Sequence, residues 1–174
     1  TFQGGSDGGF SQSGVTVDAT GNLYTATSSF GSGSAGTVVK LSPANGGYTY
    51  SLLASFSGAG IPFQGGVRED LVMDQAGNLY GTTNSAGAHG YGAVFKLTRS
   101  GNTWTYTSLY DFTGSNYGFN PVSNIVIDAS GLFSYDTRFL SKWVLTVNGE
   151  RLNALSVDDL QYFQSRFFLV PGTG

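Results

Sequence analysis

Three aspartates that recur at almost even spacing are the residues whose type and position could support chemistry. They are Asp18, Asp74 and Asp128. Each begins an Asp-x-x-Gly segment, and oxygen-rich turns are the kind of site that calcium selects. Each turn offers only one carboxylate, however, and an aspartate in this position readily accepts a hydrogen bond from its own downstream N–H. We therefore favour a structural turn over calcium binding and predict no metal ligands.

The residues that follow each aspartate fit the same interpretation. Glycine tolerates the positive φ that ends a tight turn, and asparagine is common in turns. The first two copies both read Asp-x-x-Gly-Asn-Leu-Tyr, whereas the third departs from this pattern after its glycine. The predicted turn residues are Asp18, Gly21, Asn22, Asp74, Gly77, Asn78, Asp128 and Gly131.

Residues suited to catalysis are sparse. His89 is the only histidine and lies in a glycine-rich loop without an obvious acidic partner. Glycoside hydrolysis needs two carboxylates that face each other across a cleft, but the pairs Glu69-Asp70 and Asp158-Asp159 are adjacent in sequence. Neighbours on an extended strand point to opposite faces, so we interpret these pairs as solvated loop charge. Phosphate-binding and nucleophile motifs are also absent from the sequence. We predict no catalytic residue, no cofactor and no enzymatic activity.

Aromatic side chains provide the remaining candidate site. Tyr48 and Tyr50 alternate with smaller residues, and Trp104 and Tyr106 do so at the corresponding place in the next copy. Because side chains alternate between the faces of a strand, each pair shares one face. Packing in the core or between units is the favoured interpretation, whereas on a solvent-facing surface these rings could stack on sugars or contact another subunit. Tyr48, Tyr50, Trp104 and Tyr106 are therefore the candidate ligand-binding residues.

Composition favours an all-β fold and excludes several classes of partner. The 174 residues include 27 glycines, and only 11% are charged, which suits short strands joined by tight turns. A net charge of -3 disfavours nucleic acid, which requires a basic face. The sequence has no cysteine and no apolar run long enough to span a membrane. The chain begins at Thr1, so we expect that a signal peptide or a longer upstream region has been removed.

The spacing of the aspartates predicts four-stranded antiparallel repeats of a propeller-like kind. The repeat region is predicted to span residues 1–131, with units at about 14–69 and 70–123 and partial units at both ends. The strands predicted for the first unit are Gly14–Val17, Leu23–Ser28, Gly36–Leu41 and Tyr48–Phe56. Those predicted for the second unit are Asp70–Met73, Leu79–Asn84, Ala93–Thr98 and Trp104–Phe112.

Three blocks that recur in order support a family resemblance. They are Asp74–Thr83, Gly92–Thr98 and Leu109–Gly114 in the second copy. Through these blocks, residues 1–131 resemble the GloVer-type tandem repeats of bacterial choice-of-anchor surface proteins. The resemblance implies an exported β protein, extracellular or at the cell surface. It brings no catalytic residue with it.

The composition changes after Gly131, where glycine becomes rare and charge more frequent. Residues 132–174 are predicted to form a separate module with a β-hairpin, Ser141–Val147 and Glu150–Leu155, joined by the favoured Asn148-Gly149 turn. Three segments of this tail resemble the start of the N-terminal domain of bacterial glycogen-debranching amylo-α-1,6-glucosidases, namely 131–141, 143–149 and 154–156. In that family the hydrolytic carboxylates belong to a separate helical domain, to which nothing in this chain corresponds.

Two and a half units are too few to close a ring and leave unpaired strand edges, which invite another chain. We therefore hypothesise that the protein self-associates into a homo-oligomer or a filament and has a structural or adhesive role outside the cell. The alternative is a carbohydrate-binding or accessory module linked to glucan metabolism.

Overall fold

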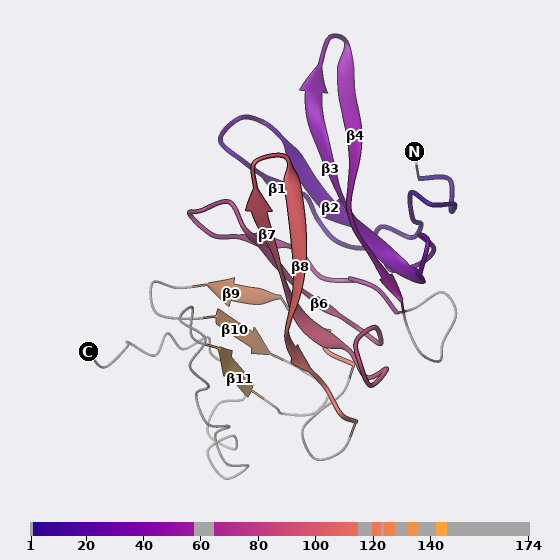
Figure 1. The fold of residues 1–174 in the computed structure, drawn as a ribbon, viewed down its shortest axis with the longest axis vertical. Helices are drawn as coiled ribbons and strands as arrows, with labels where there is room; N and C mark the ends of the chain where they lie inside the picture. Colours follow the sequence, from indigo (N-terminus) through magenta and orange to yellow (C-terminus); the bar gives the residue numbers. More distant parts are fainter. Residues whose placement is uncertain are drawn as a thin grey trace, which may run out of the picture.

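The described part of the chain is built entirely from β-strands and turns. The computed structural model describes residues 2–57, 65–114, 120–122, 124–127, 132–135 and 142–145. Every regular element within them is a strand, so the predicted all-β class is confirmed. Each predicted repeat unit forms one four-stranded antiparallel sheet in which the strands follow chain order (Figure 1).

Both four-stranded sheets have short inner strands and a long outer hairpin. The first sheet consists of β1 (Thr16–Val17), β2 (Leu23–Ala26), β3 (Ser34–Ala44) and β4 (Gly47–Ser57). The second consists of β5 (Val72–Met73), β6 (Leu79–Thr83), β7 (Ala93–Ser100) and β8 (Thr103–Asp111). A third sheet has the order β11-β10-β9, with β9 at Ile125–Ile127, β10 at Leu132–Tyr135 and β11 at Lys142–Leu145.

The two four-stranded sheets share one register shift at equivalent positions, although the first sheet has a further shift between Ser34 and Thr37 that the second lacks. The outer hairpin of the first sheet has a register shift between Val38 and Val39, and that of the second has one between Val94 and Phe95. These two shifts are separated by the same interval as the aspartates of the first two turns, so they occupy equivalent positions in the repeat. A shift of this kind inserts an extra residue and increases the local twist, so both sheets twist at the same place.

The first outer hairpin is longer than its sequence predicts. Pairing continues past Leu41 to Ala44 and Gly47, which face each other across a two-residue turn. The sequence predicted that the first of these strands ends at Leu41 and that the second begins only at Tyr48. Asn45-Gly46 alone makes the connection, and Gly46 takes a positive φ of 81°, which glycine tolerates.

The main core lies between the first and second sheets. Phe56 of β4 packs on Phe95 of β7 with ring centroids 5.1 Å apart, and Tyr24 of β2 meets Trp104 of β8 edge-on at 5.9 Å. The buried residues of this core are Tyr24, Ala26, Ala35, Val38, Phe56, Val67, Leu71, Leu79, Ala86, Phe95 and Leu97. The opposite face of the second sheet packs on β9 through a smaller cluster of Tyr80, Val94, Phe112 and Ile125.

Hydrogen bonds along the inner strands reinforce this stacking. Asp70 at the start of the second unit accepts the N–H of Gly14, and the amide oxygen of Asn124 accepts the N–H of Asp70 at 3.0 Å. Thr16 also donates its hydroxyl to the carbonyl of Leu71. Asp70 was predicted to be a solvated loop charge; its side chain is exposed, but it links the two units.

Several predicted features lie wholly or partly outside the described residues. Asp128 and Gly131 lie outside them, and so does most of the hairpin predicted around Asn148-Gly149. The described part of that hairpin, Lys142–Leu145, pairs with β10. The third sheet therefore joins strands from both sides of residue 131. Among the described residues, no helix is long and apolar enough to cross a membrane.

Equivalent positions in the two units should respond differently to truncation. Leu71 is 3% exposed between the sheets, whereas Val15, its equivalent in the first unit, is 57% exposed. Leu71→Ala should lower the free energy of unfolding by about 2–5 kcal/mol, and Val15→Ala by less than about 0.5 kcal/mol. Urea unfolding measures both values. Equal losses for the two variants would contradict the packing of the second sheet on the first.

Candidate binding surface

Among the described residues, most of the exposed large hydrophobic side chains lie on the outer face of the first sheet. We call it the open face and define it by Val15, Val17, Tyr48, Tyr50 and Leu52, all of which are exposed. Cross-strand pairing and alternation along the strands place these residues on the face opposite Tyr24. The open face therefore points away from the second sheet.

The candidate aromatic residues divide between two environments. Tyr48 and Tyr50 on β4 are exposed, at 55% and 44%. Trp104, at the position equivalent to Tyr48, is partly buried against the main core. Tyr106, the equivalent of Tyr50, keeps 42% of its surface exposed but packs against Phe56 and Phe95, with ring centroids 5.9 Å away in both cases. The aromatic pair of this strand thus forms a contact between units in the second copy and an exposed surface in the first.

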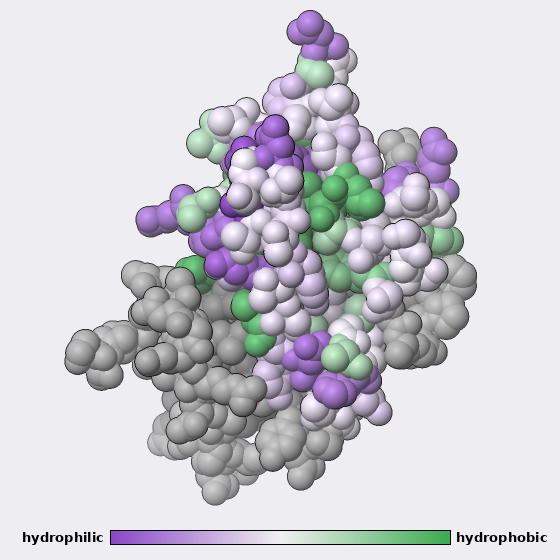
Figure 2. Space-filling view, in the orientation of Figure 1, coloured by the Kyte–Doolittle hydropathy of each residue, from purple (hydrophilic) through white to green (hydrophobic). Residues whose placement is uncertain are grey.

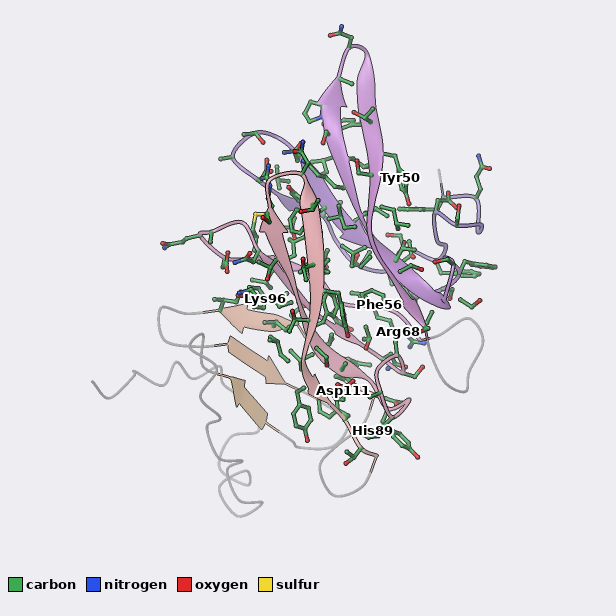
Figure 3. The ribbon with its side chains drawn as sticks, in the orientation of Figure 1. Tyr50, Phe56, Arg68, His89, Lys96 and Asp111 are labelled. Atoms are coloured by element: carbon green, nitrogen blue, oxygen red, sulfur yellow. The ribbon has the colours of Figure 1, made fainter. Side chains whose placement is uncertain are left out.

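The figures show how the hydrophobic surface lies around β4. In Figure 2, hydrophobic side chains gather beside β4, next to β8. Tyr50 points away from the second sheet, whereas Phe56, further along the same strand, lies toward it (Figure 3). One strand therefore contributes to the core at one end and to the surface at the other.

The repeated turns are held by the same side-chain network in both units. The carboxylate of Asp18 accepts the backbone N–H of Asn22 at 3.0 Å, its side-chain amide at 2.7 Å and the hydroxyl of Tyr24 at 3.0 Å. Asp74 makes the same three contacts with Asn78 and Tyr80, at 2.8, 2.8 and 3.0 Å. Gly21 and Gly77 in these turns have φ near 80°. Tight turns alone do not require the tyrosine, which links each turn to the core.

This network shifts the acidity of its members. Burial raises the pKa of the Asp18 carboxyl, but hydrogen bonds from Asn22 and Thr20 outweigh that effect, so the pKa lies below its ordinary value. The pKa of Asp74 is lowered in the same way, against the effect of burial. Burial, and then the hydrogen bond to the aspartate, raise the pKa of Tyr24 and of Tyr80 to about 12. Each aspartate is therefore held as a carboxylate and each tyrosine as a phenol.

Lysines complete the two networks. The ammonium of Lys40 lies 6.0 Å from the ring centre of Tyr24, and that of Lys96 lies 5.4 Å from the ring centre of Tyr80. These distances are within the range of a cation–π contact. The sequence offered a signal for this arrangement, because a lysine follows the turn tyrosine at the same interval in both copies.

The remaining candidate residues have structural environments. His89 is exposed in the β6–β7 loop, and Asp111 accepts the N–H of the adjacent Ala88 at 2.8 Å and the hydroxyl of Ser108 at 2.7 Å (Figure 3). Burial, and then the charge of Asp70, raise the pKa of Glu69. Among the described residues, no three His, Asp or Glu side chains form a group that could hold a metal. Asp158 and Asp159 lie outside the described residues.

Two equivalent β units stacked through their faces define a tandem-repeat β protein. The chain belongs to the Gloeobacter/Verrucomicrobia repeat family, whose sequence profile matches residues 1–137. Residues 119–174 match a second profile, the N-terminal domain of some glycogen debranching enzymes. Both resemblances inferred from the sequence are therefore confirmed. A comparison with curated proteins finds no match.

The tyrosines of the turn networks predict a loss of stability at alkaline pH. Their pKa is about 12 in the folded protein and about 10 in an unfolded chain, so their contribution is fully present below pH 10 and is lost between pH 10 and 12. The variant Tyr24→Phe/Tyr80→Phe should be less stable at pH 8, by about 1 kcal/mol per lost hydrogen bond, but should lose less stability from pH 10 to 12.

Urea unfolding at each pH measures this difference between the variant and the wild type. Tyr50 and Tyr106, whose pKa values are also raised by burial, account for part of the decline that persists in the variant. A variant that loses as much stability as the wild type over this range would show that the two turn tyrosines are not responsible.

Proposed function

We propose that the chain is a structural repeat protein outside the cell or on its surface, with a propeller-like series of four-stranded units whose open strand edges bind further copies. Membership of the repeat family supports the repetitive architecture. The likeness to repeats of bacterial surface proteins supports the location. The low charge and the commitment of Asp18 and Asp74 to turns favour a structural role over a catalytic one.

The observation that carries the proposal is the length and composition of the outer edge strands. β4 runs over 11 residues, lies at the edge of its sheet and contains no charged residue. β8 lies at the corresponding edge of the second sheet, and its only charged residue is Asp111. Such edges present backbone N–H and C=O groups to other strands, and proteins that remain monomeric usually block them with lysine, proline or a short strand.

Lysines placed in β4 should prevent this association. Thr49 and Ser51 are exposed and lie in the outer half of the strand. The variant Thr49→Lys/Ser51→Lys should remain monomeric at concentrations at which the wild type forms larger species, because lysines on an edge strand disfavour its pairing with a strand of another chain. Sedimentation velocity over a wide concentration range measures the mass of both proteins.

The matched control is Asn45→Lys/Asn102→Lys, which adds the same charge at the two hairpin turns rather than in the edge. It should associate like the wild type. A wild type that stays monomeric throughout the range would refute association. Equal loss of association in both variants would show that net charge, rather than the β4 edge, is responsible.

A second candidate function is glycan binding at the open face. Tyr48 and Tyr50 present two exposed rings on one side of β4, and exposed aromatic rings can stack on the apolar faces of sugars. The match of residues 119–174 to a domain of glycogen debranching enzymes favours a glucan as the ligand.

Isothermal titration with maltoheptaose tests this candidate. Tyr48→Ala/Tyr50→Ala should weaken binding at least about tenfold, which corresponds to ~1.4 kcal/mol. Tyr91→Ala removes an exposed tyrosine from a loop of the second unit and should leave the affinity unchanged. Absence of heat with the wild type, or equal affinity in all three proteins, would eliminate maltoheptaose binding at this face.

A further inference from the structure

The open face has a covered counterpart within the same molecule. Val15, Val17 and Tyr48 of the first unit correspond in the second unit to Leu71, Met73 and Trp104. Leu71 is buried in the main core, and Met73 and Trp104 pack against it. The first sheet covers that second set with the face that carries Tyr24 and Phe56. The contact between the two sheets thus shows what can cover this face of the repeat, namely the Tyr24 face of a neighbouring unit.

The chain also approaches both units in the same way. Gly9 exchanges backbone hydrogen bonds with Ser29, at 2.9 and 3.2 Å. Gly65, the equivalent of Gly9 in the next repeat, accepts the N–H of Ser85 at 3.1 Å. Residues around Gly9 therefore occupy, beside the first unit, the place that the connection between the units occupies beside the second.

We propose that the open face is a docking surface for one further four-stranded unit of the same repeat, which would cover it as the first sheet covers the second. The docked unit would present a tyrosine and a phenylalanine at the positions of Tyr24 and Phe56. Its tyrosine ring would meet Tyr48 as Tyr24 meets Trp104, and its phenylalanine would meet Tyr50 as Phe56 meets Tyr106. Val15 would be buried beneath it and Val17 partly buried, as Leu71 and Met73 are in the second unit.

The occupant is a further repeat unit rather than a second copy of these two. Docking requires a free face of the Tyr24 type, and both such faces in the described residues are covered. The face with Tyr24 and Phe56 packs on the second sheet, and the face with Tyr80 and Phe112 packs on β9. A second copy of the described residues, folded in the same way, therefore has no uncovered face of this type. This docking also differs from the edge-to-edge association proposed above, because it uses a face and not the β4 edge.

One hydrogen bond of the contact between the first and second sheets would be missing from the new contact. Asp70 accepts the N–H of Gly14, and Gly14, at the equivalent position in the first unit, has no side chain with which to accept one. The docked unit would therefore be held by apolar and aromatic contacts with one hydrogen bond fewer. Its attachment should still cover Val15 and Val17, because neither residue takes part in that bond.

A lengthened chain tests the proposal directly. A second copy of residues 10–65 is inserted before residue 10 of the full chain, so that the original first unit acquires a preceding unit. The protein contains no cysteine, so a single Val15→Cys substitution in the original unit reports on its own exposure. Its rate of reaction with a thiol reagent such as dithionitrobenzoate is compared with the rate of Val15→Cys in the unlengthened chain.

The expected result is a fall of at least tenfold in the reaction rate on lengthening. The rate should approach that of Leu71→Cys, the covered equivalent, which should react slowly in both chains. Val15→Cys in the added unit should react as fast as in the unlengthened chain, because that unit now carries the open face. These comparisons do not depend on whether the protein associates through β4.

Three results would overturn the proposal. The first is a Val15→Cys in the original unit that stays fully reactive after lengthening. The second is an added unit that does not fold against the face, shown by fast reaction of its own Val38→Cys, since Val38 is fully buried in the first unit. The third is protection of Val15→Cys in the unlengthened chain as the protein concentration rises, which would identify a second copy as the occupant.

Discussion

The apolar contact between the first and second sheets is the interaction on which the rest of the structure depends. A four-stranded sheet of this size has two faces and cannot bury either one alone. Tyr24 and Phe56 from one unit close over Leu71, Phe95 and Leu97 from the next, and the result is the main core. Without this contact, the first unit would be a twisted sheet of two short strands and a long hairpin, with little apolar surface removed from water, and the second would keep only its smaller cluster with β9.

The aspartate turns are coupled to this core through their tyrosines. The hydroxyl of Tyr24 is fixed by Asp18, while its ring packs edge-on against Trp104 of the next unit. The same side chain therefore closes a turn and forms an interface between units. This double role explains why an Asp-x-x-Gly-Asn-Leu-Tyr segment, rather than any tight turn, recurs in both copies.

Much of the fold could be predicted from the sequence because its determinants are local. The Asp-x-x-Gly turns, their regular spacing and the alternation along Tyr48–Phe56 were enough to predict all-β units and approximate strand positions. The length of the first hairpin was underestimated, because Pro43 and Gly47 resemble turn residues although both lie in strands. The register shift at Val38 left no comparable signal, since nothing in the residue types marks it.

The environment of each face could not be predicted, because it depends on a neighbour that the local sequence does not specify. Tyr48 and Trp104 have the same place in the repeat and the same alternation, yet one is exposed and the other is packed between sheets. The hydrogen bond of Asp70 was not predicted either, because its partner, Gly14, lies in the preceding unit. Sequence periodicity thus identifies what a unit is, and only the stacking of units determines which surfaces are free.

A double-mutant cycle between Tyr24 and Trp104 tests the stacking of the two units most directly, because these residues meet only if the sheets pack face to face. Tyr24→Leu, Trp104→Leu and the double variant are compared with the wild type by urea unfolding. Stacking predicts a coupling free energy of about 0.5–1.5 kcal/mol for an aromatic pair in edge-on contact. Additive effects, within about 0.3 kcal/mol, would mean that the two rings do not touch and would contradict the face-to-face arrangement of the sheets.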